Sequence, residues 1–101
     1  MVKKYIPRQG DIVYLDFAPT KGHEQTGYRS AVVVSNNVFN DNTKMAFVCP
    51  ITSNDKEFPT HYLLEDTRSI DYEIRNIKFV ERLSDNDFIS VITLLNACIA
   101  E

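Results

Sequence analysis

The residue types that could carry out chemistry gather in one polar segment near the start of the chain, between Thr20 and Ser30. The candidate side chains in this segment are Lys21, His23, Glu24, Gln25, Tyr28 and Arg29. Glu24 offers a general base, and Arg29 offers a permanently charged planar fork that suits a phosphate group. We therefore treat this segment as the candidate site.

A carboxylate, an arginine and hydroxyl groups suit the cleavage of RNA by its own 2′-hydroxyl. In that reaction a base removes the hydroxyl proton, a cation stabilises the crowded phosphorane, and an acid protonates the leaving 5′-oxygen. Thr52 and Ser53 follow another apolar run, and we expect their hydroxyls at the same edge of the molecule. The 2′-hydroxyl would also explain the selection of RNA over DNA.

Residue types alone leave a structural alternative open. Glu24 and Arg29 could form a surface salt bridge that pins a loop and is worth about 0–1 kcal/mol. His23 is a common loop residue, and Thr52 is a common turn residue. Tyr28 could pack on a rim or stack on a base. The chemistry of these residues therefore does not decide the function.

Alternating and β-branched apolar runs predict several short strands that would position this segment. The predicted strands cover residues 11–17, 31–35, 45–52, 60–65 and 76–83, with 31–35 at the centre of the sheet. We expect Pro19 to end the first strand and Pro50 to halt the third. Residues 36–44, rich in Asn and Asp, are predicted as a turn, and residues 71–75 as a helical turn.

The end of the sequence changes to helical periodicity. One face of a helix from about residue 85 to residue 100 collects Phe88, Val91, Ile92, Leu95 and Ile99. Ser84, followed by Asp87, favours a capping box at the start. Leu94 and Cys98 widen the apolar stripe, which a second subunit would help to cover. The sum is a mainly β fold: a small, mostly antiparallel barrel or half-barrel with a helix across it.

Composition restricts the classes of function. The 101 residues suffice for one domain, and the net charge of −3 argues mildly against wholesale nucleic-acid binding. Residues 1–30 carry a balance of +2 and the rest −5, which fits either a local anion site on an acidic body or a mixed solvated surface. Cys49, Cys98 and two scattered histidines show no metal-ligand spacing, so we expect no metal or cofactor, and two buried free thiols.

The sequence also bears on location. No apolar run reaches membrane-spanning length, and the N-terminal MVKKYIPRQG lacks the apolar stretch of a signal peptide. We expect a cytoplasmic protein without a membrane partner.

Four blocks of the sequence run over nearly the whole chain: GDIVYLDFAPTKGHEQTGYRSAVVVS, PITS, FPTHYLL and RSIDYEIRNIKFVERL. Together they resemble the MazF/PemK family of toxin endoribonucleases. PTKGHEQTGYR is the most specific part, because it combines the order and spacing of many unlike residues. The resemblance implies a homodimeric, SH3-like small barrel of the CcdB/PemK/MazF type with a C-terminal helix.

The same resemblance implies a function. It implies a type II toxin that cleaves single-stranded messenger RNA sequence-specifically and without a metal, and a cognate antitoxin with an acidic-apolar tail. By position, Glu24 would be the base, Arg29 would stabilise the phosphorane, and Thr52 would hold the phosphate beside Ser53. The residues implied to contact RNA are Lys21, His23, Gln25 and Tyr28.

Two positions depart from the family pattern. Ser30 stands where the family usually has proline, and Thr67 meets Arg68 directly where the family usually has a further turn and strand. A missing strand would leave an unpaired edge and an incomplete groove. Two alternatives therefore stay open: a shortened, catalytically impaired toxin that still dimerises and binds antitoxin, and a CcdB-like toxin that binds gyrase.

Overall fold

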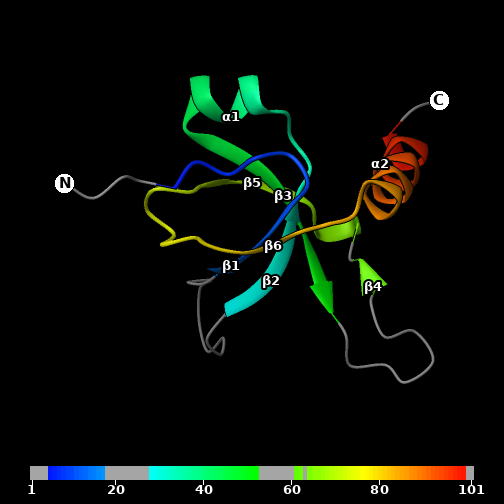
Figure 1. Cartoon of the computed structure of the whole chain (residues 1–101), viewed down its shortest axis with the longest axis horizontal. Coiled ribbons are helices and arrows are strands. Elements are labelled where there is room, and N and C mark those ends of the chain that lie inside the picture. Colours follow the sequence, from blue (N-terminus) through cyan, green and yellow to red (C-terminus); the bar gives the residue numbers. More distant parts are fainter. Residues whose placement is uncertain (1–4, 18–27, 53–60, 63, 100–101) are drawn as a thin grey trace.

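The structure, a computed structural model, describes residues 5–17, 28–52, 61–62 and 64–99. Within these residues, six strands form one antiparallel sheet in the order β4-β3-β2-β1-β6, and β5 also pairs with β3 (Figure 1). The strands are β1 (Asp11–Asp16), β2 (Tyr28–Val33), β3 (Met45–Thr52), β4 (His61–Tyr62), β5 (Arg68–Asp71) and β6 (Lys78–Arg82).

In the described part of the chain, two α-helices flank the sheet at different places. Helix α1 (Asn37–Thr43) joins β2 to β3 at the top of the view in Figure 1, and helix α2 (Asp85–Ile99) lies to the right. A short 3-10 helix, η1 (Leu64–Asp66), leads from β4 to β5. The mostly antiparallel sheet with a C-terminal helix agrees with the fold class that the sequence predicts.

The sheet is apolar on both faces, which creates two packed clusters. The first contains Val13, Leu15, Ala31, Val33, Ala46, Val48, Ile70 and Tyr72. The second contains Val32, Val34, Cys49 and Val91, with Phe88, Ile92 and Leu95 of α2 packed against it. Because successive β2 residues point to opposite faces, the run AVVV serves both clusters. Burial of β2 on both faces of the sheet fits a central strand, which its β-branched run predicts.

Strand β2 begins earlier than the sequence predicts. The expected strand is 31–35, with Tyr28 and Arg29 in a preceding loop, whereas β2 covers Tyr28–Val33. Pairing with β1 causes the difference, because Asp16 lies opposite Tyr28 and Leu15 opposite Arg29. Both candidate residues are therefore held by a backbone ladder.

Pro50 does not halt β3, which continues to Thr52. On one edge, β3 pairs with β5 over Met45–Val48 and with β4 over Ile51–Thr52. Pro50 falls between these two partners, so on this side of β3 its missing backbone N–H interrupts neither pairing. A missing strand was expected to leave an unpaired strand edge, but β4 and β5 pair with these stretches of β3.

The segment 36–44 is a helix rather than the predicted turn. Asn36 caps α1 by accepting a 2.8 Å hydrogen bond from the Phe39 N–H, and Lys44 ends it with a left-handed φ of 61°. Asn40 is fully buried, and its Nδ2 donates to the Pro7 carbonyl at 2.9 Å. These capping and tertiary hydrogen bonds overcome the low helix propensity of asparagine.

The predicted strand 60–65 is wrong in extent, because β4 is confined to His61–Tyr62 and residues 64–66 form η1. Strand β5 is missing from the prediction, since RSID offers only one buried side chain, Ile70. The predicted helical turn at 71–75 has its counterpart in the structure, where the Arg75 N–H donates to the Asp71 carbonyl at 3.1 Å.

Helix α2 matches the predicted position of about 85–100 closely. Its start is capped as expected, because the Asp87 N–H donates to Ser84 Oγ at 3.2 Å. Val91 is fully buried against the sheet, whereas Ile99 is 72% exposed. Cys49 is buried as predicted, but Cys98 is exposed on this helix, which corrects the expectation for that thiol. Within the described ranges, no helix combines the length and apolarity needed to cross a membrane.

Candidate functional site

The end of β1, the start of β2 and the end of β3 lie together at one end of the sheet, which we call the sheet edge. Strand β1 ends at Asp16 opposite Tyr28, the first residue of β2. Arg29 lies two residues before Ala31, and Thr52 lies two residues after Pro50, the antiparallel partner of Ala31. Antiparallel register therefore brings Arg29 and Thr52 to the same end of neighbouring strands, at the bottom of the view in Figure 1.

Tyr28 presents an aromatic platform at this edge. Its ring is 43% exposed and stacks on Tyr14, with ring centroids 5.5 Å apart and an interplanar angle of 23°. The stacking fixes the orientation of Tyr28 while one part of the ring faces solvent. A platform of this kind can receive a base at low conformational cost.

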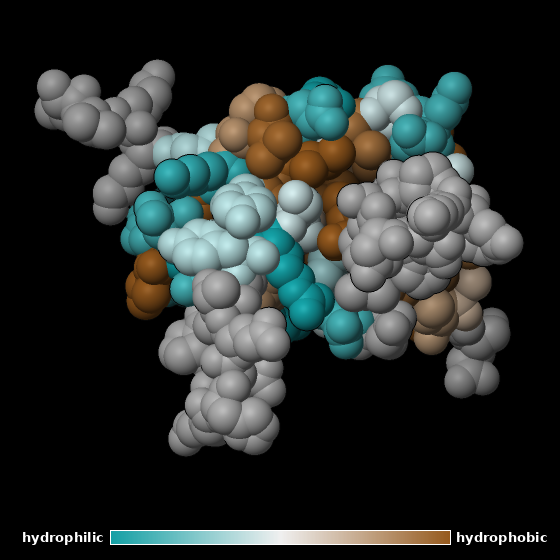
Figure 2. Space-filling model, turned by 90° about the horizontal axis from the view of Figure 1, so that it is seen from below, coloured by the Kyte–Doolittle hydropathy of each residue, from teal (hydrophilic) through white to brown (hydrophobic). Residues whose placement is uncertain are grey.

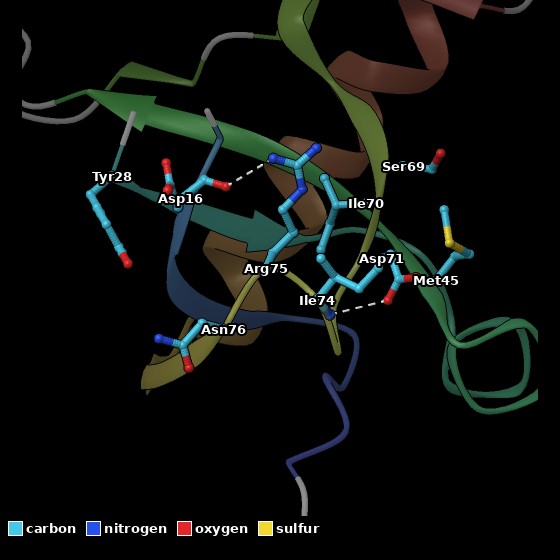
Figure 3. A pocket seen from close by; sticks show the side chains of 9 residues that line it. All are labelled: Asp16, Tyr28, Met45, Ser69, Ile70, Asp71, Ile74, Arg75 and Asn76. Carbon is cyan, nitrogen blue, oxygen red and sulfur yellow. Dashed lines mark hydrogen bonds between the residues drawn. The ribbon is translucent and has the colours of Figure 1, made fainter. Parts of the chain in front are cut away.

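Two further arginines hold the end of β1. The Arg68 guanidinium lies 5.0 Å from the centroid of the Phe17 ring, and its Nη2 donates to the Phe17 carbonyl at 2.7 Å. Arg75 Nη1 donates to the Asp16 carbonyl at 3.4 Å (Figure 3). The two contacts act on Asp16 and Phe17, so β5 and the turn after it fix the end of β1.

A depression of about 550 Å³ opens beside these residues, and we call it the Arg75 depression. Its lining residues are Asp16, Tyr28, Met45, Ser69, Ile70, Asp71, Ile74, Arg75 and Asn76. In Figure 3, Arg75 lies between Tyr28 on one side and Ser69 on the other. Figure 2, which views the molecule from below, shows hydrophobic surface next to a band of hydrophilic side chains.

Residues 71–76 form one wall of the depression as a turn that side-chain hydrogen bonds and one left-handed residue stabilise. Asp71 Oδ1 accepts hydrogen bonds from the N–H groups of Glu73 at 3.1 Å and Ile74 at 3.3 Å. Asn76 then takes a left-handed φ of 56°, a conformation that asparagine tolerates better than most residues. The turn leaves Ile74 78% exposed and Asn76 at the surface.

The predicted site residues divide into two groups. Tyr28, Arg29 and the backbone of Thr52 come together at one sheet edge. The others, Lys21, His23, Glu24, Gln25 and Ser53, lie outside the described residues. Their roles stay predictions.

The sequence prediction missed Asp16, Arg68, Arg75 and Asn76 at this edge. A signal was present, since three of them fall within the block RSIDYEIRN that carries the family resemblance. The approach of Arg68 and Arg75 to the end of β1 depends on the pairing of β5 with β3, a long-range contact that no local sequence pattern predicts.

Among the described residues, no three side chains of His, Cys, Asp or Glu converge to hold a metal ion. On β4, burial raises the pKa of the Tyr62 phenol, and the nearby Asp87 and Cys49 add to the effect. Tyr62 therefore stays neutral at physiological pH and acts as a packing residue beside the end of β3.

Residues 8–99 match the family model described as PemK-like, MazF-like toxin of type II toxin-antitoxin system. This match covers most of the chain. The chain belongs to this family.

Individual relatives agree with that assignment. The endoribonuclease toxin MazF of Escherichia coli (strain K12) is 44% identical over 64 residues, which are 63% of this chain and 58% of the relative. The endoribonuclease MazF of Staphylococcus saprophyticus is 33% identical over 63 residues, which are 60% of this chain and 52% of the relative. The chain thus spans less than two thirds of the length of these relatives.

Solved structures resemble this chain over nearly its full length. A MazE-MazF structure (Form-II) from Deinococcus radiodurans matches with a TM-score of 0.81 and 29% identity, covering 95% of this chain and 97% of that chain. A MazF structure (Form-I) from the same organism matches with a TM-score of 0.80 and 29% identity, covering 97% and 100%. The likeness supports the SH3-like barrel with a C-terminal helix.

Proposed function

We propose that this chain is the toxin of a type II toxin-antitoxin system and acts as a sequence-specific, metal-independent endoribonuclease on single-stranded mRNA. The observation that carries the proposal is the placement of Arg29 beside Thr52 at one sheet edge, in a chain of the PemK-like, MazF-like toxin family. The relatives named endoribonuclease support the same activity.

Each candidate residue has a role in this reaction. Glu24 removes the proton of the attacking 2′-hydroxyl, Arg29 stabilises the phosphorane and supplies a proton to the leaving oxygen, and Thr52 holds the phosphate. Ser53 lies next to Thr52 in the sequence and shares that role. The residues that contact the RNA chain are Lys21, His23, Gln25 and Tyr28.

The setting of Arg29 suits a transition-state role. Its backbone is fixed opposite Leu15 in the β1–β2 ladder, while its side chain is exposed to an incoming phosphate. A guanidinium on a rigid strand loses little freedom when it binds, so more of its interaction energy is available in the transition state. Ser30, which replaces the usual proline, is held in the same ladder opposite Tyr14.

The first experiment is incubation of the purified chain with single-stranded RNA in the presence of EDTA. We expect cleavage that survives the chelator and leaves a 2′,3′-cyclic phosphate end. Glu24→Gln and Arg29→Ala should each lower the rate by about 10²–10⁴-fold, the usual contribution of a positioned acid, base or charge stabiliser.

Arg8→Ala is the matched control, because Arg8 is exposed and only its backbone takes part in its two hydrogen bonds with Asp11: its N–H donates to Asp11 Oδ2, and its carbonyl accepts from the Asp11 N–H. Its rate should stay near that of the unaltered chain. Cleavage by both Glu24→Gln and Arg29→Ala at the control rate would remove this assignment.

Partners follow from the same proposal. Two similar Deinococcus radiodurans structures are MazE-MazF structures, which supports an antitoxin partner for this chain. We propose that this antitoxin binds through an acidic-apolar tail. We also propose that the 101 residues form a single toxin domain, that two copies form a homodimer, and that the protein works in the cytoplasm.

One observation favours a second candidate, a shortened toxin that binds antitoxin without cutting RNA. Strand β5 begins at Arg68, only one residue after η1 ends at Asp66, so the chain has no further strand at this point. Antitoxin binding without RNA cleavage by the unaltered chain would support this candidate. Robust cleavage in EDTA would end it.

A further inference from the structure

We propose that the Arg75 depression binds one unstacked nucleobase of the RNA, next to the phosphate contacted by Arg29, and that Asn76 helps to select that base. The inference rests on the proposed ribonuclease function and adds to it a base-binding site with named walls. The inference starts from position: Tyr28 lines the depression and begins β2, and Arg29 follows it, so both side chains leave the same strand end, although toward opposite faces of the sheet.

The size and walls of the depression suit a flat, partly polar ligand. Its volume of about 550 Å³ lies within the range of roughly 300–1,000 Å³ that is common for small-molecule sites. Tyr28 supplies an aromatic surface already fixed by stacking on Tyr14, and Ile74 supplies an exposed apolar one. Sequence-specific RNA recognition places unstacked bases on such surfaces and contacts their edges by hydrogen bonds.

The charges of the lining favour a base over a phosphate or an acidic peptide. Asp16 and Asp71 contribute two carboxylates, whereas Arg75 contributes one guanidinium. Arg75 is also directed to the β1 end, where it donates to the Asp16 carbonyl. A second anion would therefore be repelled here, while the Asn76 amide offers a neutral base both donors and an acceptor.

Asn76 is the residue best placed to read the base edge. Its exposed side chain lies in the lining next to Arg75 and carries both donors and an acceptor. The left-handed backbone at this position tolerates asparagine and aspartate, so Asn76→Asp can replace the donors by acceptors without new strain. The variant also adds one negative charge, which needs a control.

The test maps cut sites by end sequencing after cleavage of an RNA pool of random sequence, and measures binding of an uncleavable 2′-O-methyl oligonucleotide by fluorescence anisotropy. Asn76→Asp should change the base preference at one position beside the cut and weaken binding of the preferred oligonucleotide by about tenfold. Asn42→Asp, an equal charge change at an exposed residue of α1, should leave the base preference unchanged.

A general charge effect would weaken all RNA sequences alike, so the shift in base preference is the deciding observation. Identical cut sites and affinities for Asn76→Asp and Asn42→Asp would overturn the base-binding site while leaving the ribonuclease assignment intact. Unchanged RNA behaviour with weaker antitoxin binding would make the depression a peptide site and also overturn the inference. Failure of the unaltered chain to bind or cut any RNA would refute the proposed function and, with it, this site.

Discussion

At the scale of single residues, buried polar groups connect parts of the chain that are distant in sequence. The Tyr72 hydroxyl donates to the Asn40 carbonyl at 2.8 Å, and the Asn40 amide donates to the Pro7 carbonyl. Ser35 Oγ donates to Asn40 Oδ1 and accepts from the Phe47 N–H. One hydrogen-bond network therefore joins the N-terminal segment, α1, β3 and the turn after β5. The later residues of that turn line the Arg75 depression.

Tyr72 predicts how stability depends on pH. Burial raises the pKa of its phenol above the usual 10.0, and Glu73, Asp41 and Asp71 add to the shift. The unfolded chain therefore loses this proton first as the pH rises, so the free energy of unfolding is maintained below about pH 10 and falls above it. Tyr5, whose hydroxyl donates to Asp11, has a raised pKa for the same principal reason.

Urea unfolding between pH 8 and pH 11 measures this effect. Tyr72→Phe should lower the free energy of unfolding by about 1 kcal/mol at pH 8, through loss of the hydrogen bond, and should make the alkaline decline shallower. The difference in the free energy of unfolding between the two chains at pH 8 measures the loss of the hydrogen bond separately from the titration at higher pH. A decline as steep as that of the unaltered chain would show that Tyr72 does not contribute to it.

At the scale of elements, β5 and its following turn act on the candidate site from outside it. Phe17 directly follows β1, and the Arg68 guanidinium contacts both its ring and its carbonyl. Because Arg68 follows η1 almost directly, the short η1–β5 connection sets the position of this arginine. We infer that Arg68 is a positioning residue for Glu24.

Arg68→Gln tests this role. We expect kcat for RNA cleavage to fall by about ten- to a hundredfold with a smaller change in KM, since a misplaced base affects the transition state more than substrate binding. Arg68→Lys should recover part of the loss, because the ammonium keeps the charge but not the planar fork. Arg8→Gln is the matched control.

The split between kcat and KM separates this role from general destabilisation. An equal loss of activity and thermal stability in Arg68→Gln, with no recovery in Arg68→Lys, would mean that the residue is only structural.

At the scale of the whole molecule, exposed apolar side chains lie at several places on the described residues, and three of them lie on α2. One side of this helix packs on the sheet through Val91, while Ile89, Leu94 and Ile99 are each more than half exposed. Exposed apolar surface on a terminal helix is typical of subunit contact. This distribution supports α2 as part of the proposed homodimer interface.

Light scattering at micromolar concentration tests the homodimer. The unaltered chain should have twice the mass of one chain, and Leu94→Glu with Ile99→Glu should shift the mass toward one chain, because two carboxylates would be buried in an apolar contact. Val38→Glu, at an exposed residue of α1, is the control and should stay dimeric. A single-chain mass for the unaltered protein would contradict the proposal.

Local patterns in the sequence determined a large part of this protein. The alternation in residues 11–17 marks β1, the run AVVV marks a central strand, and the helical spacing with Ser84 marks α2. The unlike residues of PTKGHEQTGYR identify the family. These features are readable because each depends on a period or order within a few residues.

Only the tertiary structure decided the helix at 37–43, the strand at 68–71 and the arginines around the end of β1. Asn40 is helical because distant carbonyls satisfy its buried amide, and β5 exists because β3 offers an edge. Arg68 reaches Phe17 across 51 sequence positions. Contacts of that range depend on the chain as a whole, so no window of the sequence carries them.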